Sequence, residues 1–161
     1  MSSSISRSIP TGRLRKLQFL IGEFSGLETL YPPESSPVQF LAFLTGQWET
    51  CDRFIKLDFY AEIPKFGIES FHGLITYSES RETYRMWLFA ASQEEPLHMM
   101  GDFEDEETIR FVGDPTPMTW GMQRLRFTFR PLQEGGYELL GERWEPDGYA
   151  KYCSVTYREE I

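Results

Sequence analysis

The sequence contains few of the residues that usually build metal sites and disulfide frameworks. Among 161 residues there are two cysteines, Cys51 and Cys153, and two histidines, His72 and His98. The cysteines have no paired spacing, so we expect buried free thiols in a reducing compartment, with a single disulfide as the alternative. Neither histidine has another histidine, a cysteine or a paired carboxylate at metal-ligand spacing. We therefore expect no metal site built by the protein.

Positive charge and long apolar runs are also scarce. Sixteen Lys and Arg against 25 Asp and Glu give a formal net charge of −9, whereas a nucleic-acid partner favours a positive field. The longest apolar stretch, Phe40–Leu44, is far too short to span a bilayer. Met1–Pro10 is rich in serine and lacks the apolar core of a signal peptide. We expect a cytoplasmic protein with no nucleic-acid partner, no membrane partner and, since no glycine-rich phosphate loop occurs, no cofactor.

Aromatic residues, by contrast, are abundant. They make up 16% of the chain, as 13 Phe, 8 Tyr and 4 Trp, and 40% of all residues are hydrophobic. A chain of this length can bury a good core without disulfides or metals. We expect one domain over residues 11–161 behind a disordered tail over residues 1–10. The aromatic side chains either fill a core or line a cavity, and the sequence leaves both open.

The fold prediction starts from the stretch Phe71–Ala91. Its two runs, His72–Tyr77 and Thr83–Ala90, are rich in β-branched and aromatic residues and are joined by a polar turn, which predicts an antiparallel hairpin. Leu97–Phe103 and Thr108–Val112 form a similar pair around an acidic turn. Repeated pairs of this kind predict a closed or nearly closed antiparallel sheet.

The inward face of Thr83–Ala90 remains open at this stage. The residues Tyr84, Met86 and Leu88 compete for it with Arg85, Trp87 and Phe89.

Two segments near the N-terminus are predicted to be helical. Thr11 can cap a short helix over Arg13–Ile21, in which three apolar side chains have helical spacing and Gly22 ends the run. Val38–Leu44 is acceptable as a strand, but Pro37 at a first helical position and a capping pattern favour a short helical or irregular segment.

The last third of the chain predicts a strand register. Met122–Arg130 and Tyr137–Trp144 flank a three-residue loop, Gln133–Gly135, in which glycine can adopt a left-handed conformation. Opposite charges then fall on one face and apolar partners on the other, as cross-strand pairing favours. The predicted pairs are Arg130 with Glu138, Arg126 with Glu142, Phe129 with Leu139 and Phe127 with Gly141.

The next turn, Glu145–Tyr149, is a second hairpin signal. If Glu145 faces Tyr149, Arg143 and Lys151 lie opposite one another on the inward face. Two readings follow. Either this end of the sheet opens and both side chains extend into solvent, or they form an anion site at a barrel mouth.

Three further residues are candidates for a ligand site in such a sheet. His98 lies between apolar residues of a predicted strand, and a histidine there either completes a core by hydrogen bonding or faces a pocket. Trp87, at the centre of the hairpin, packs in the core or lines that pocket. His72 is the third candidate.

Several residues resemble those of a known family. The run Gly22–Gly26 after a short helix resembles the opening Gly-x-Trp-x-Gly of calycin-type (lipocalin-like) barrels, with Phe24 in place of tryptophan. Further aromatic and glycine positions are similar to an uncharacterised bacterial domain-of-unknown-function family with that barrel. These positions are Phe71-His72-Gly73, Tyr77, Tyr84, Trp87, Phe89, Gly101-Asp102-Phe103-Glu104 and Tyr157-Arg158.

The resemblance implies a mainly β fold: an antiparallel calycin/lipocalin-like barrel of about eight to ten strands with a short N-terminal helix and a central pocket. It also implies that Arg158 of the last strand packs across Phe24. The haem-binding nitrobindins share the opening motif and a following Tyr-Pro, similar to Tyr31-Pro32 here. Their axial histidine lies late in the chain, and this sequence has no histidine after His98.

We therefore predict a small-molecule binding protein with an aromatic pocket for a hydrophobic ligand, with or without an anionic head. The predicted ligand-binding residues are His72, Trp87, His98, Arg143 and Lys151, and no catalytic residue is assigned. The alternatives are a cofactor-free enzyme with a pocket histidine as acid–base, a haem-binding barrel, and a solid barrel without ligand that acts through a homo-oligomer surface.

Overall fold

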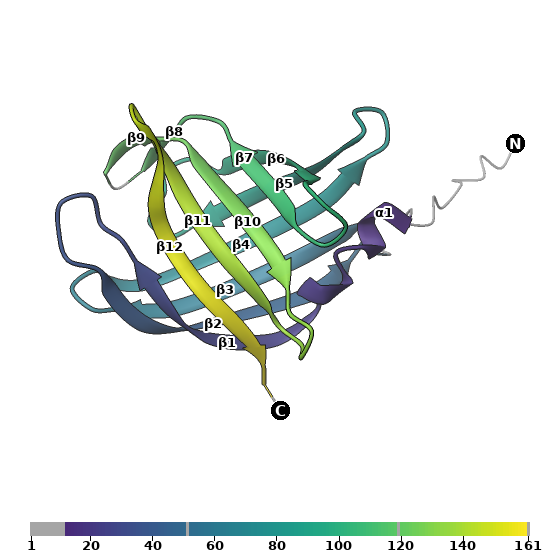
Figure 1. Ribbon diagram of the computed structural model, residues 1–161, viewed down its shortest axis with the longest axis horizontal. Coiled ribbons are helices and arrows are strands. Elements are labelled where there is room, and N and C mark those ends of the chain that lie inside the picture. Colours follow the sequence, from purple (N-terminus) through teal and green to yellow (C-terminus); the bar gives the residue numbers. More distant parts are fainter. Residues whose placement is uncertain (1–11, 51, 119, 161) are drawn as a thin grey trace, which may run out of the picture.

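The computed structural model describes residues 12–50, 52–118 and 120–160, so the predictions for Cys51, Thr11 and the tail 1–10 lie outside the described residues. Within this part, ten antiparallel strands close into a barrel in the order β1-β12-β11-β10-β7-β6-β5-β4-β3-β2 (Figure 1). The barrel strands are β1 (Gly22–Leu30), β2 (Val38–Glu49), β3 (Phe54–Ile63), β4 (Gly67–Ser78), β5 (Thr83–Ala90), β6 (Leu97–Phe103), β7 (Ile109–Gly113), β10 (Leu125–Pro131), β11 (Tyr137–Glu145) and β12 (Gly148–Glu159). The prediction of a mainly β antiparallel barrel is confirmed.

A small two-stranded sheet stands apart from the barrel wall. It consists of β8 (Thr116–Met118) and β9 (Gly121–Gln123), and it lies in the connection between β7 and β10. Figure 1 shows this sheet at one end of the barrel and the N-terminal helix at the other. Among the described residues, no helix is long and apolar enough to cross a membrane.

The predicted register between β10 and β11 is confirmed at all four pairs. Arg126 lies opposite Glu142 and Arg130 opposite Glu138, and both pairs form salt bridges. The turn closes with a hydrogen bond from the Leu132 amide to the Gly136 carbonyl, and Gly135 has a φ of 92°. Because turn chemistry and cross-strand pairing agree here, residue type alone was sufficient to predict the register.

The predicted helix over Arg13–Ile21 is wrong in length. It divides into α1 (Gly12–Arg15) and a 3₁₀ turn, η1 (Gln18–Leu20). Leu14, Leu17 and Leu20 are buried, and their spacing of three matches the 3₁₀ period better than the α-helical one. The segment is a plug for one end of the barrel. The Tyr84 hydroxyl at that end donates a hydrogen bond to the Arg13 carbonyl.

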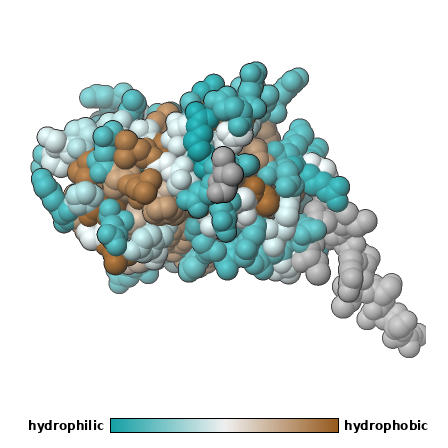
Figure 2. All heavy atoms as spheres, turned by 90° about the horizontal axis from the view of Figure 1, so that it is seen from below, coloured by the Kyte–Doolittle hydropathy of each residue, from teal (hydrophilic) through white to brown (hydrophobic). Residues whose placement is uncertain are grey.

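The preference for a helical Val38–Leu44 is also wrong, because these residues begin strand β2. Phe40, Ala42 and Leu44 face inward and are buried, while Leu41 and Phe43 face outward and are exposed. Both faces are apolar, so the period of two that marks a strand is concealed in the sequence. Apolar side chains also gather on one outer face of the molecule, toward the end away from the N-terminus (Figure 2).

Strand β5 shows which of its two faces points inward. Tyr84, Met86 and Leu88 are buried, whereas Arg85 and Trp87 are only partly covered and lie on the outside of the barrel. Arg85 is therefore an outer-wall residue.

The predicted pairing of Arg143 with Lys151 is wrong. A register shift between Gly141 and Glu142 places Arg143 opposite Ala150 and Lys151 opposite Glu142. The lack of a side chain at Gly141 permits this irregularity, because a Cβ at that position would lie only 2.5 Å from the Cys153 sulfur. The extra residue is Tyr152 of β12. The residues of β12 on the turn side of Tyr152 therefore change faces relative to Cys153, and Lys151 is exposed.

The expected packing of Arg158 on Phe24 is wrong as well. Arg158 lies on the outer surface, where its guanidinium pairs with Glu134 at 2.9 Å. Phe24 is buried and packs edge-on against Tyr137, with 5.1 Å between ring centroids. The aromatic partner of Phe24 therefore comes from β11.

Candidate functional site

A cavity of about 380 Å³ lies in the barrel interior and opens toward the end that carries β8 and β9. Its wall is mostly aliphatic and aromatic, and the volume is within the range of small-molecule sites. The apolar lining includes Leu30, Phe40, Leu44, Leu57, Phe59, Phe71, Met86, Leu88, Leu97, Leu125, Phe127, Phe129 and Leu139. The barrel is thus hollow at one end, while the leucines of α1 and η1 fill the other.

Aromatic side chains surround the mouth of this cavity. Phe66, in the β3–β4 turn, meets Trp120 edge-on with 6.1 Å between ring centroids. Trp120 in turn contacts Tyr152 of β12, with 6.0 Å between centroids. All three line the cavity. Trp120 therefore joins two sides of the rim and partly covers the opening.

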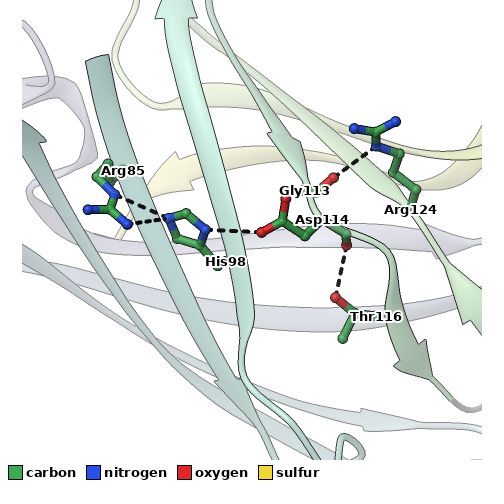
Figure 3. A network of polar contacts seen from close by, with 6 residues as sticks. All are labelled: Arg85, His98, Gly113, Asp114, Thr116 and Arg124. Atoms are coloured by element: carbon green, nitrogen blue, oxygen red, sulfur yellow. Dashed lines mark hydrogen bonds and ion pairs between the residues drawn. The ribbon is translucent and has the colours of Figure 1, made fainter. Parts of the chain in front are cut away.

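A chain of polar contacts on the outer wall holds the segment that carries Trp120. Figure 3 shows His98 of β6 between Arg85 and Asp114. The Arg85 Nε donates to His98 Nε2 at 3.2 Å, and His98 Nδ1 lies 3.2 Å from the Asp114 carboxylate. Because Nε2 accepts from Arg85, the ring proton resides on Nδ1 and points to Asp114. The Asp114 amide also donates to the His98 carbonyl at 3.1 Å.

Two more contacts hold this segment at its ends. The Thr116 hydroxyl donates to the Asp114 carbonyl at 2.9 Å, and the Arg124 Nε donates to the Gly113 carbonyl at 3.1 Å (Figure 3). Together with the β8–β9 pairing, these bonds fix the connection between β7 and β10. His98 therefore links Arg85 of β5 to the segment after β7 on the outer face of the barrel.

The five residues predicted as ligand-binding lie around the barrel, and none of them lines the described central cavity. Trp87 and His98 contact one another on the outer wall, with 5.3 Å between ring centroids. His72 pairs with Asp58 on the outer surface and lines a separate hollow of about 320 Å³ outside the barrel. Lys151 is exposed, and its ammonium lies 5.6 Å from the Tyr31 ring centroid.

Arg143 is the one member of this set that is buried, at 8% exposure. Its guanidinium donates to Glu145 at 2.9 Å, to the Tyr31 carbonyl at 2.7 Å and to the Lys151 carbonyl at 3.0 Å. These bonds tie the β1–β2 loop to β11 and β12. The guanidinium is therefore bonded to protein groups, and Arg143 is not among the residues that line the cavity.

The polar residues that do line the cavity were not predicted from the sequence. Glu28 of β1 is 7% exposed, and burial raises the pKa of its carboxyl to about 8. One carboxylate oxygen of Glu69 and the side-chain carbonyl of Gln93 are buried without a hydrogen-bond partner among the described residues. A signal for Glu28 existed, because Phe24, Glu28 and Leu30 share the inward parity of β1.

Strand β12 supplies the other polar groups near Glu28. Burial raises the pKa of the Tyr152 phenol and of the Cys153 thiol, and the negative charge of Glu28 raises both further. The same two causes raise the pKa of Tyr157. These three side chains therefore stay protonated at neutral pH. Among the described residues, no group of three His, Cys, Asp or Glu is arranged to hold a metal ion.

Comparison with known proteins supports the fold and gives no information about the chemistry of the cavity. The chain is similar to the crystal structure of Rv2717c from M. tuberculosis, with a TM-score of 0.68 and 12% sequence identity over 94% of this chain and 99% of that one. No protein-family model and no curated protein matches the sequence. At this identity the similarity shows a shared barrel fold.

Proposed function

We propose that this protein is a lipocalin-like binding barrel that accepts a small hydrophobic molecule in its central cavity. The observation that carries the proposal is the cavity itself, a hollow of about 380 Å³ with a largely apolar wall and an aromatic rim. A folded protein that leaves such a space unfilled loses the packing that filling it would provide. A ligand that enters buries its own apolar surface and restores those contacts.

The lining favours a ligand without an anionic head. Its described members include two carboxylic acids, Glu28 and Glu69, and contain no lysine, arginine or histidine. The same composition weighs against the two alternatives that need a pocket histidine, an acid–base enzyme and a haem barrel with a histidine ligand. Both histidines have carboxylate partners, but these pairs lie on the outer wall.

Titration with the neutral fluorescent probe N-phenyl-1-naphthylamine tests the proposal. We expect saturable, blue-shifted fluorescence at micromolar concentrations of the wild-type protein. The variant Ala90→Trp should bind at least about tenfold more weakly, a loss of roughly 1.4 kcal/mol, because Ala90 lines the cavity and an indole there occupies the ligand volume.

The matched control is Phe89→Trp, which adds the same indole one residue earlier. Phe89 is exposed on the outside of the barrel, so this variant should keep the wild-type affinity. Absence of saturable binding to the wild type, or equal affinity of Ala90→Trp and the wild type, would contradict the proposal.

A further inference from the structure

The polar side chains among the described residues that line the cavity are rich in hydrogen-bond acceptors. Glu28 is more than nine-tenths buried, faces the cavity, and has no side-chain hydrogen bond to any described residue. Glu69 and Gln93 line the same cavity, and each has one buried side-chain oxygen without a hydrogen-bond partner among the described residues. Buried acceptors without a donor cost free energy, so this wall favours an occupant that supplies hydrogen-bond donors.

The two carboxyls come from different parts of the barrel wall, because β2 and β3 separate β1 from β4. Both carboxyls raise the pKa of the Tyr152 phenol, and Tyr152 lines the same cavity. Tyr152 also forms part of the rim with Trp120. Most of the remaining cavity wall is apolar.

The charges around Glu28 favour a cation. On β12, Tyr152, Cys153 and Tyr157 face it as neutral groups. The cation that acts on Tyr152 is Arg143, whose guanidinium is already bonded to Glu145 and to two backbone carbonyls. Strand β2 contributes the apolar ring of Phe40 opposite Glu28. No described lysine, arginine or histidine enters the cavity to neutralise the two carboxyls.

We propose that the occupant of this cavity is a lipophilic amine, bound with its ammonium group against Glu28 and its apolar body among the aromatic side chains. This inference rests on the proposed function and narrows it to one ligand class. An ammonium carries three donors, and the wall offers Glu28, Glu69 and the Gln93 carbonyl as acceptors. Charge-assisted bonds of this kind are the strongest that the site can form.

Proton linkage gives this ligand class a characteristic signature. Before a ligand binds, the Glu28 carboxyl holds its proton at neutral pH, since its pKa lies near 8. An ammonium binds to the carboxylate, so binding below pH 8 releases a proton and becomes tighter as pH rises. The affinity should increase about 50-fold between pH 6 and pH 8 and then level off. A neutral ligand of the same shape shows no such increase.

The test compares three eight-carbon compounds, octylamine, octan-1-ol and octanoate, by displacement of N-phenyl-1-naphthylamine between pH 6 and pH 8.5. At pH 8.5 octylamine should bind at least about tenfold more tightly than octan-1-ol, and octanoate should bind most weakly. Glu28→Gln should lower the octylamine affinity to that of octan-1-ol and abolish its pH dependence. The matched control is Glu23→Gln, on the exposed side of β1, which should keep the wild-type affinities for all three compounds and the pH dependence of octylamine.

The outcomes separate this inference from the proposal on which it rests. If octan-1-ol and octylamine bind equally at every pH, or octanoate binds most tightly, the amine is ruled out and the hydrophobic binding site stands. If Glu28→Gln leaves the pH dependence of octylamine unchanged, Glu28 is not the receptor group and the inference is overturned. If none of the three compounds displaces the fluorescent probe, the inference is overturned, and if the probe itself does not bind, the proposed function falls with it.

Discussion

Glu28→Gln is expected to raise the free energy of unfolding by about 3 kcal/mol at pH 7 and by almost nothing at pH 4.5. The reason is the cost of burying a carboxyl without a partner. Burial raises its pKa from 4.5 to about 8, and each unit of difference between folded and unfolded states is worth 1.36 kcal/mol. At pH 7 the unfolded chain has ionised Glu28 while the folded protein still holds its proton.

The direction of this effect follows from proton linkage. Below pH 4.5 the carboxyl is protonated in both states and contributes nothing. Between pH 4.5 and 8 the unfolded state loses its proton first, so the wild type becomes less stable as pH rises. Above pH 8 both states are ionised and the penalty is constant. Glutamine has nearly the same shape and no charge, so the variant avoids this loss.

Urea unfolding at a series of pH values measures the difference. The control is Glu23→Gln, an exposed position on the same strand, for which the change should stay within about 0.5 kcal/mol at every pH. A Glu28→Gln variant that is no more stable than the wild type at pH 7 would show that the carboxyl is solvated or paired. A stability cost retained at one cavity residue is typical of functional sites.

Gly46→Ala is expected to destabilise the protein by roughly 3 kcal/mol, the upper part of the range for overpacked sites. A Cβ at Gly46 would lie 1.8 Å from the carbonyl oxygen of Leu20, and that oxygen belongs to the backbone of the N-terminal plug. Strand β2 or the plug must move, and Leu14, Leu17 and Leu20 would lose part of their burial.

Thermal and urea unfolding of Gly46→Ala measure this loss. Gly12→Ala is the control, since nothing lies within 4 Å of a Cβ at Gly12, and its effect should remain within about 0.5 kcal/mol. Equal stability of the two variants would mean that the plug does not rest on β2.

The strands were predictable wherever local chemistry and cross-strand pairing agreed. The loop Gln133–Gly135 and the charge pairs beside it predict the register of β10 and β11, and the structure has the same pairs. Strand β2 was not predictable in this way, because Leu41 and Phe43 make its outer face as apolar as its inner face. Periodicity distinguishes a strand from a helix only when the two faces differ.

The cavity was harder to predict than the barrel. The positions of Arg143 and Lys151 depend on a bulge at Gly141, and a single inserted residue exchanges the two faces of a strand. His98 and Trp87 lie in apolar surroundings along the chain, but their strand parity directs them outward. Glu28 has inward parity, and an isolated carboxylate in a strand is most often on the solvent side. The signal for the site in the sequence was therefore Glu28 itself, a charged residue at a position of β1 that faces inward.

The central claim, a hollow barrel that binds apolar molecules inside, is tested most directly by methyl NMR of leucine-labelled protein titrated with octan-1-ol. We predict chemical-shift changes at Leu57, Leu88 and Leu125, whose side chains line the cavity. The methyl groups of Leu27 and Leu41, which are exposed on the outer wall, should stay unchanged. Shifts confined to the outer leucines, or no saturable shift at any leucine, would contradict the claim.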